Sequence, residues 1–156
     1  MPSARCEEIQ RALAAGGVES TVSNDIVAEM WEKFSGFVAV AAIASLTRGR
    51  AGEVAAATAG ASVAAAAIDE CARVAAAEGH PFPAAMRELV RGLYARASSP
   101  YGPSLLWDLE NGRRTEGEHT IGDLVRRADS HGLDVPILRA ALCNLQIYEA
   151  RRSAQT

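Results

Sequence analysis

The sequence of 156 residues has no long hydrophobic segment and no excess of basic residues. Its longest mainly apolar runs, 37–46 and 54–68, are shorter than the roughly 20 residues that cross a bilayer as a helix. Both runs are therefore predicted to be buried helices, and no membrane partner is expected. The formal net charge of −3 also gives no reason to expect nucleic acid as a partner.

Cysteine is scarce and widely spaced. Cys6, Cys71 and Cys143 form no Cys-x-x-Cys pair and no cysteine–histidine pattern with the spacing of a metal site. They are predicted to be reduced, mostly buried thiols of a cytoplasmic protein, and no metal site is expected. The first residues also lack the apolar core of a secretory signal.

The sequence motifs of nucleotide-binding and hydrolytic sites are absent too. There is no Gly-x-Gly-x-x-Gly after a strand, no phosphate-binding Gly-x4-Gly-Lys-Ser/Thr and no Gly-x-Ser-x-Gly. His80, His119 and His131 have no acidic or cysteine partner at the spacing of metal ligands or of a catalytic triad. The chain by itself therefore offers no recognisable cradle for a nucleotide.

Helical periodicity, by contrast, runs through almost the whole sequence. Hydrophobic residues make up 49% of the chain and charged residues 22%, as in an ordinary globular domain. Only 18–22 is a candidate for a short strand, so strand content is expected to be near zero. We predict an all-α fold of seven or eight helices. The expected helices are 4–15, a long helix within 23–48, 52–57, 61–78, 84–97, 104–109, 116–131 and 134–152.

The domain is predicted to fold around the long helix within 23–48. Residues 23–25 (Ser-Asn-Asp) can accept hydrogen bonds from the free amides of its first turn, and Gly49 is available to stop it. After Lys33 every face of this helix is apolar, and a helix that is apolar on all sides is buried on all sides. Lys33 therefore stands at the edge of a buried segment.

Lys33 has two interpretations. Charged residues on helices usually face water, so the spacing alone favours an exposed lysine beside Glu29 and Glu32. Alternatively, the ammonium group is held at a cleft and acts as a general acid. Glu116 at a helix start and Ser104 at a capping position also have ordinary structural explanations.

Several local pairings near the later helices are predicted as well. Thr115 and Glu118 have the spacing of a capping box at the start of the helix 116–131. His131, at the end of that helix, is expected to interact with the helix dipole. Pairs of arginines such as Arg126 and Arg127 are predicted to form solvated faces.

Four stretches of the sequence carry a family resemblance. They read IVAEMWEKF, AEGHPFP, SLLWDLENGRRTE and GDLVRRADSHGLDVP. Their most specific part combines Trp-Glu-Lys on a long helix with Ser-x-x-x-Asp, Gly-Arg-x-Thr-Glu and His-Gly-x-x-x-Pro. Over about residues 22–150, the chain resembles the C-terminal domain of the ketopantoate reductase (2-dehydropantoate 2-reductase) family.

This resemblance implies an all-helical domain similar to the C-terminal domain of 6-phosphogluconate dehydrogenase. In the family, the domain follows an N-terminal Rossmann domain that binds NADPH, and the active site lies in the cleft between the two. Residues 1–22 would then be the tail end of a Rossmann domain that is otherwise missing, and 23–156 the helical domain. The implied partners are NADPH through the missing domain, a small-molecule 2-oxo acid, and a second copy of the chain in a homodimer.

The resemblance also assigns roles to individual residues. The family's catalytic lysine falls on Lys33, which would donate a proton to the keto oxygen of the substrate, or polarise it, as hydride arrives from NADPH. The motif glutamate falls on Glu116, which would hold the lysine and a substrate hydroxyl. The substrate serine falls on Ser104, near the substrate carboxylate.

At several positions the sequence departs from the family pattern. Phe37, Ala41 and Tyr101 stand at substrate-binding positions where the family commonly has asparagine, and Trp107 replaces a glutamine. The acid-catalytic residues persist while these contacts lose their amides. We therefore expect a substrate that is bulkier or less hydroxylated than ketopantoate.

The sequence is also compatible with two other functions. A helical module that dimerises or binds a partner without catalysis would explain the missing nucleotide cradle. A related dehydrogenase with an unrelated substrate is a further possibility, because fold does not fix function. Alone, the chain is expected neither to bind NADPH tightly nor to turn over, and its apolar face around Phe37 and Trp107 should promote self-association.

Overall fold

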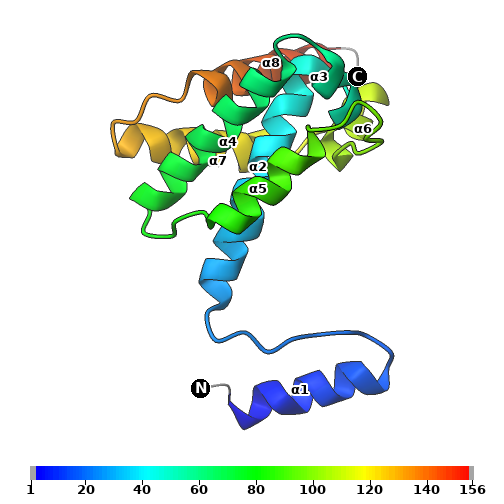
Figure 1. Ribbon diagram of the computed structural model, residues 1–156, viewed down its shortest axis with the longest axis vertical. Coiled ribbons are helices and arrows are strands. Elements are labelled where there is room, and N and C mark those ends of the chain that lie inside the picture. Colours follow the sequence, from blue (N-terminus) through cyan, green and yellow to red (C-terminus); the bar gives the residue numbers. More distant parts are fainter. Residues whose placement is uncertain (1–2, 155–156) are drawn as a thin grey trace. The chain divides into compact units, whose positions relative to one another are not determined.

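The computed structural model describes residues 3–154, which form eight α-helices and no β-strand. The predicted all-α fold is confirmed (Figure 1). The helices are α1 (Ala4–Ala15), α2 (Ile26–Thr47), α3 (Ala51–Ala56), α4 (Gly60–Ala77), α5 (Ala84–Leu93), α6 (Ser104–Glu110), α7 (Gly117–Ser130) and α8 (Pro136–Ser153).

The start of α2 agrees with the predicted cap, whereas its end differs from the prediction in one residue. At its start, Oδ1 of Asp25 accepts a hydrogen bond of 3.1 Å from the amide of Ala28, as predicted for a helix cap. At its end, Arg48 rather than Gly49 adopts the left-handed conformation, with φ 53°. The expectation that glycine would stop the helix was therefore wrong. The Arg48 guanidinium lies 5.5 Å from the ring centroid of Tyr148, a contact that accompanies this unusual conformation.

The helix α5 is shorter than expected, and the segment that follows it packs against α3 instead of continuing the helix. It ends at Leu93, whereas the sequence predicts a helix to about Ala97. The following segment passes against α3, where the amide of Gly52 donates to the carbonyl of Ser99 at 3.0 Å. A Cβ atom at Gly52 would overlap the carbonyl oxygens of both Ala97 and Ser99, so only glycine allows this approach.

The chain divides into two compact units, with the division between Met30 and Trp31, inside α2. The predicted division falls earlier, between residues 22 and 23. In the first unit, no residue from Ser3 onward is buried. The apolar face of α1 is exposed, with Ile9 at 50%, and 18–22 is irregular chain rather than the short strand considered.

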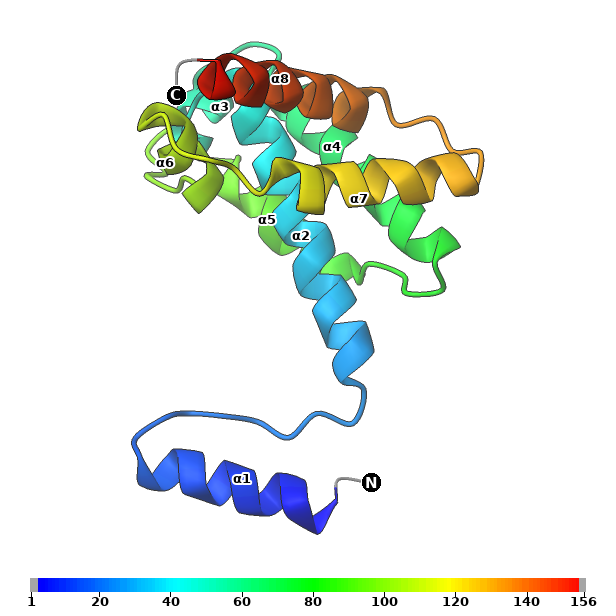
Figure 2. The same cartoon turned by 180° about the vertical axis from the view of Figure 1, so that it is seen from behind.

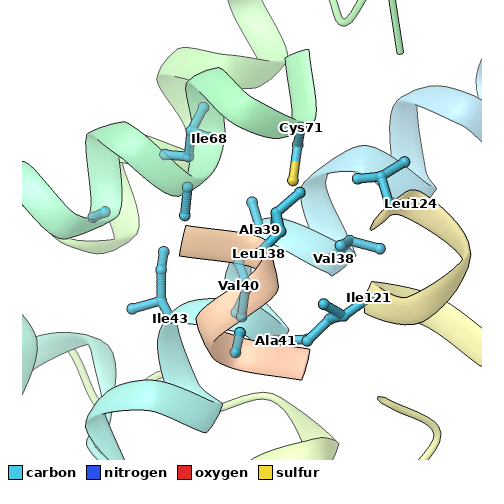
Figure 3. Packing of buried hydrophobic residues seen from close by; sticks show 14 of the residues in the cluster. Val38, Ala39, Val40, Ala41, Ile43, Ile68, Cys71, Ile121, Leu124 and Leu138 are labelled. Atoms are coloured by element: carbon cyan, nitrogen blue, oxygen red, sulfur yellow. The ribbon is translucent and has the colours of Figure 1, made fainter. Parts of the chain in front are cut away.

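The second unit holds the hydrophobic core. In Figures 1 and 2, which show opposite sides, the part of α2 after Trp31 lies between α4 and α5 on one side and α7 on the other. Ten of the residues of α2 between Ser35 and Ser45 are buried, which confirms the prediction that this part of the helix is enclosed on all sides. Figure 3 shows the centre of this core. Its labelled residues are Val38, Ala39, Val40, Ala41, Ile43, Ile68, Cys71, Ile121, Leu124 and Leu138.

Small residues let the helices of this core approach closely. An added Cβ at Gly36 of α2 would lie 3.4 Å from a methyl group of Val90 on α5. An added Cβ at Gly117, the first residue of α7, would overlap the side chain of Leu145 on α8. Alanines contribute to the same core, in which Ala39, Ala41 and Ala67 are completely buried.

The cysteines only partly follow the prediction. Cys71 is buried, and its burial raises the pKa of its thiol, whereas Cys6 and Cys143 are exposed. The expectation of mostly buried thiols was wrong. Cys6 lies on α1, which has no buried residue, and Cys143 lies on a side of α8 that does not face the core. Among residues 3–154, no helix has both the length and the apolar character needed to cross a membrane.

Candidate active site

Lys33 lies on α2 immediately before the buried part of the helix, and it is exposed. Within residues 3–154, its ammonium group makes no hydrogen bond or ion pair. It is also the only lysine of the chain, since the other 15 of the 16 basic residues are arginines. The exposed position agrees with the ordinary interpretation of the spacing, and the absence of an internal partner leaves the ammonium free to meet a ligand.

The turn of α2 that carries Lys33 is held in place by Trp31. The Trp31 ring stacks on His80, with 5.3 Å between ring centroids and 17° between ring planes. The Arg127 guanidinium lies over the same ring at 5.0 Å from its centroid. Trp31 thus connects α2 to the loop after α4 and to α7, and this contact fixes the helix just before Lys33.

Arg127 also belongs to a cluster of charged side chains that includes Glu78, His131 and Asp123. Glu78 accepts hydrogen bonds from Arg127 and from Nε2 of His131, the latter at 2.7 Å, and Arg127 also donates to Asp123 at 2.7 Å. These bonds, led by the one from His131, hold the pKa of Glu78 below its ordinary value. Arg127 is therefore an ion-paired, partly exposed residue rather than part of a solvated face. His131 does lie at the end of α7, and it bonds to Glu78 as well. Among the described residues, no group of three or more side chains could hold a metal ion.

Ser104 is the first residue of α6, and its side chain is exposed. The residue in the capping position is Pro103, and Ser104 forms no capping hydrogen bond, so its predicted structural role as a cap was wrong. The hydroxyl is therefore available to a ligand. Trp107, one turn later on the same face, is 48% exposed, and Arg113 covers one side of its ring at 4.1 Å from the centroid.

Glu116 precedes α7 in the capping position and is exposed. Within residues 3–154, its carboxylate makes no hydrogen bond or ion pair. The predicted capping box does not form. Thr115 donates instead to Glu149 of α8, and Glu118 pairs with Arg126 at 2.9 Å. Beside this turn lies a surface pocket of about 710 Å³, whose lining includes Thr115 and Glu149.

The remaining predicted substrate contacts differ in exposure. Tyr101 is 41% exposed, while its carbonyl oxygen accepts a hydrogen bond of 2.8 Å from the amide of Ala51. Phe37 is partly buried against the core. Ala41 is completely buried, with 0% exposure, so it has no surface to offer a substrate. Its predicted role as a substrate contact is corrected to packing inside the core.

The predicted groups are thus an amine on α2, a hydroxyl at the start of α6 and a carboxylate before α7. In the described part of the chain, no hydrogen bond or ion pair joins any two of Lys33, Ser104 and Glu116. All three residues are exposed to solvent. The fold and these groups define a helical domain that can offer a proton donor, a hydroxyl and an anion to a ligand.

Sequence comparison places the chain in a family. The family model for the C-terminal region of ketopantoate reductase PanE/ApbA matches residues 25–149. The chain belongs to this family of ketopantoate reductase C-terminal domains.

Two curated relatives and one solved structure illustrate the similarity. The uncharacterized oxidoreductase YkpB of Bacillus subtilis is 32% identical over 95% of this chain and 49% of its own length. A 2-dehydropantoate 2-reductase of Halobacterium salinarum is 34% identical over 87% of this chain and 45% of its own length. A ketopantoate reductase of the PanE/ApbA family from Ralstonia eutropha has a TM-score of 0.86 and 26% identity, covering 97% of this chain and 51% of the other. The chain thus spans about half the length of these proteins.

Proposed function

We propose that this chain is the catalytic and substrate-binding half of an NADPH-dependent 2-oxo acid reductase. The observation that carries the proposal is Lys33, the only lysine of the chain, which is exposed and has no partner within residues 3–154. It lies on a helix turn that Trp31 fixes, within the region that matches the ketopantoate reductase family.

The residues of this chain do not suit a dinucleotide. Its described residues form helices only, so they lack the strand, glycine-rich turn and helix that cradle a pyrophosphate. We therefore propose that a separate Rossmann domain binds NADPH, and that residues 1–22 are the end of that domain. When bound there, NADPH supplies hydride to the carbonyl carbon of the substrate.

The residues of the helical domain would do the acid chemistry. Lys33 Nζ donates a proton to the carbonyl oxygen, on which negative charge develops during reduction. Glu116 accepts a hydrogen bond from the resulting amine and from a substrate hydroxyl. Ser104 donates a hydrogen bond to the substrate carboxylate.

The substrate is proposed to be bulkier or less hydroxylated than ketopantoate. Phe37 and Tyr101 stand where amides are common in the family, and Trp107 leaves one face of its ring open beside Ser104. These aromatic groups favour an apolar substituent on a 2-oxo acid. Steady-state kinetics of a full-length version against a panel of 2-oxo acids tests this. Ketopantoate as clearly the best substrate would contradict it.

Replacement of Lys33 tests the proposed chemistry. In a full-length reductase, Lys33→Ala should lower kcat by about 10²- to 10⁴-fold, the usual contribution of a general acid. The matched control is Arg96→Ala, which removes an exposed cation after α5 and should leave kcat unchanged. A Lys33→Ala variant with normal turnover would rule out the proposed mechanism. The 156-residue chain alone should show no NADPH oxidation with any 2-oxo acid.

A stand-alone dimerisation or binding module remains the second candidate. The exposed side chains of Ile26, Val27 and Met30, each more than half exposed, favour an apolar contact with another surface. We propose that the protein forms homodimers in the cytoplasm. Sedimentation at several concentrations would measure this association, and an in-frame Rossmann sequence upstream in the gene would favour the reductase over the module.

A further inference from the structure

The backbone around Glu116 is held firmly although its carboxylate is free. The carbonyl oxygen of Glu116 accepts hydrogen bonds of 3.1 Å from the amides of His119 and Thr120. These bonds make Glu116 part of the first turn of α7. The direction in which its side chain projects therefore depends on what fixes the residues on either side.

Glu149 of α8 fixes the residue before Glu116. Its Oε1 atom accepts two hydrogen bonds from Thr115, one from the amide at 2.7 Å and one from the hydroxyl at 2.9 Å. Thr115 is buried, with 8% exposure, so water competes little for these bonds. Burial alone would raise the pKa of Glu149, but the hydrogen bonds from Thr115 and Arg152 outweigh it, and the pKa lies below its ordinary value.

The same helix also fixes the residue after Glu116. Leu145 lies one turn before Glu149 on α8, and its side chain packs against Gly117, where an added Cβ would overlap the Leu145 Cδ1 atom. A third contact comes from Tyr148, whose hydroxyl donates to the carbonyl of Arg113 at 2.7 Å. Three positions of α8 thus hold the chain before and after Glu116.

We propose that Glu149 is a positioning residue that sets the direction of the Glu116 carboxylate through Thr115. The proposal rests on the proposed function, because Glu116 matters to chemistry only if it meets Lys33 and the substrate. Glu149 itself touches neither. Glu149 binds the backbone amide and the hydroxyl of Thr115. Thr115 is joined to Glu116 by one peptide bond, and through it the position of Thr115 sets the direction of the Glu116 side chain.

Two substitutions at Glu149 distinguish the effect of its hydrogen bonds to Thr115 from the effect of its negative charge. In a full-length reductase, Glu149→Ala should lower kcat by about 10- to 100-fold, the usual effect of misplacing a reacting group by an ångström or less. Glu149→Gln should recover most of this loss, because its carbonyl oxygen can accept both hydrogen bonds from Thr115. In the 156-residue chain, amide hydrogen exchange should show faster exchange at Thr115 for the alanine variant and near-normal exchange for the glutamine variant.

Asp129→Ala is the matched control. Asp129 and Arg139 also connect α7 to α8, but at the opposite end of α7. This variant should lose stability without a change in kcat or in the exchange of the Thr115 amide.

The outcomes distinguish the two proposals. If Lys33→Ala and Glu116→Gln keep normal turnover, the proposed function fails. If they are inactive but Glu149→Ala keeps normal kcat despite fast exchange at Thr115, only the positioning role fails. An Asp129→Ala variant that loses as much kcat as Glu149→Ala would also overturn the positioning role, because the loss would then reflect general destabilisation.

Discussion

At the scale of single residues, Ser35 on α2 is a position where a substitution should stabilise the protein. Ser35 is completely buried on α2, and its hydroxyl has no hydrogen-bond partner among the described residues. A buried hydroxyl without a partner costs about 1–3 kcal/mol, and alanine is also the better helix former. Ser35→Ala should therefore raise the free energy of unfolding by about 1–2 kcal/mol in urea titrations. An unchanged or lower value would show that the hydroxyl is satisfied.

Two glycines should respond in opposite ways to the same substitution. Gly52→Ala would push a methyl group into the carbonyl oxygens of Ala97 and Ser99, and overpacking of this kind costs about 1–3 kcal/mol. Gly92→Ala on α5 meets no atom within 4 Å and should gain about 1 kcal/mol of helix stability. Urea titration of both variants measures the contrast. Equal effects would contradict the close approach of α3 to the segment after α5.

At the scale of helices, α2 shows how much the sequence can predict. Its cap at Asp25 and its burial after Lys33 follow from neighbours within a few residues, so periodicity and capping rules were sufficient. It ends at Thr47, inside the predicted range 23–48, but Arg48 rather than Gly49 takes the left-handed conformation. Arg48 also contacts Tyr148 of α8, 100 positions further along the chain, and local sequence rules do not reveal such a neighbour.

The start of α7 shows the same limit at the candidate site. Thr115 and Glu118 satisfy the spacing of a capping box, yet Thr115 bonds to Glu149, 34 positions away. A carboxylate from a neighbouring helix satisfied the Thr115 donors, and local spacing gave no sign of it. The choice of Lys33, Ser104 and Glu116 as candidates likewise came from family resemblance. The sequence itself carries one further signal, because Lys33 is the single lysine of the chain.

At the scale of the whole molecule, two carboxyl groups predict how stability depends on pH. The pKa values of Glu78 and Glu149 lie below their ordinary value of 4.5. Each group is therefore more readily ionised in the folded chain than in the unfolded chain, and it stabilises the fold above about pH 4.5. This contribution is lost as pH falls through the lowered pKa values, when the folded carboxylates take up protons.

Acid titration of variants checks this sign. Free energies of unfolding should fall between pH 5 and pH 3, and the fall should be less steep for Glu78→Gln and Glu149→Gln than for the unmodified chain. Glu88→Gln is the matched control, because Glu88 forms only an exposed pair within α5. A slope that stays the same in all three variants would contradict the assigned role of the two carboxylates.

The solitary lysine gives this domain a natural handle for chemical labelling. An amine-directed dye or cross-linker has one side-chain target in the whole chain, besides the terminal amino group, and that target is exposed. A label can therefore be placed at the candidate site without engineering a cysteine or removing competing amines. Fluorescence from that position would report when a cofactor domain or a second copy of the chain covers the site.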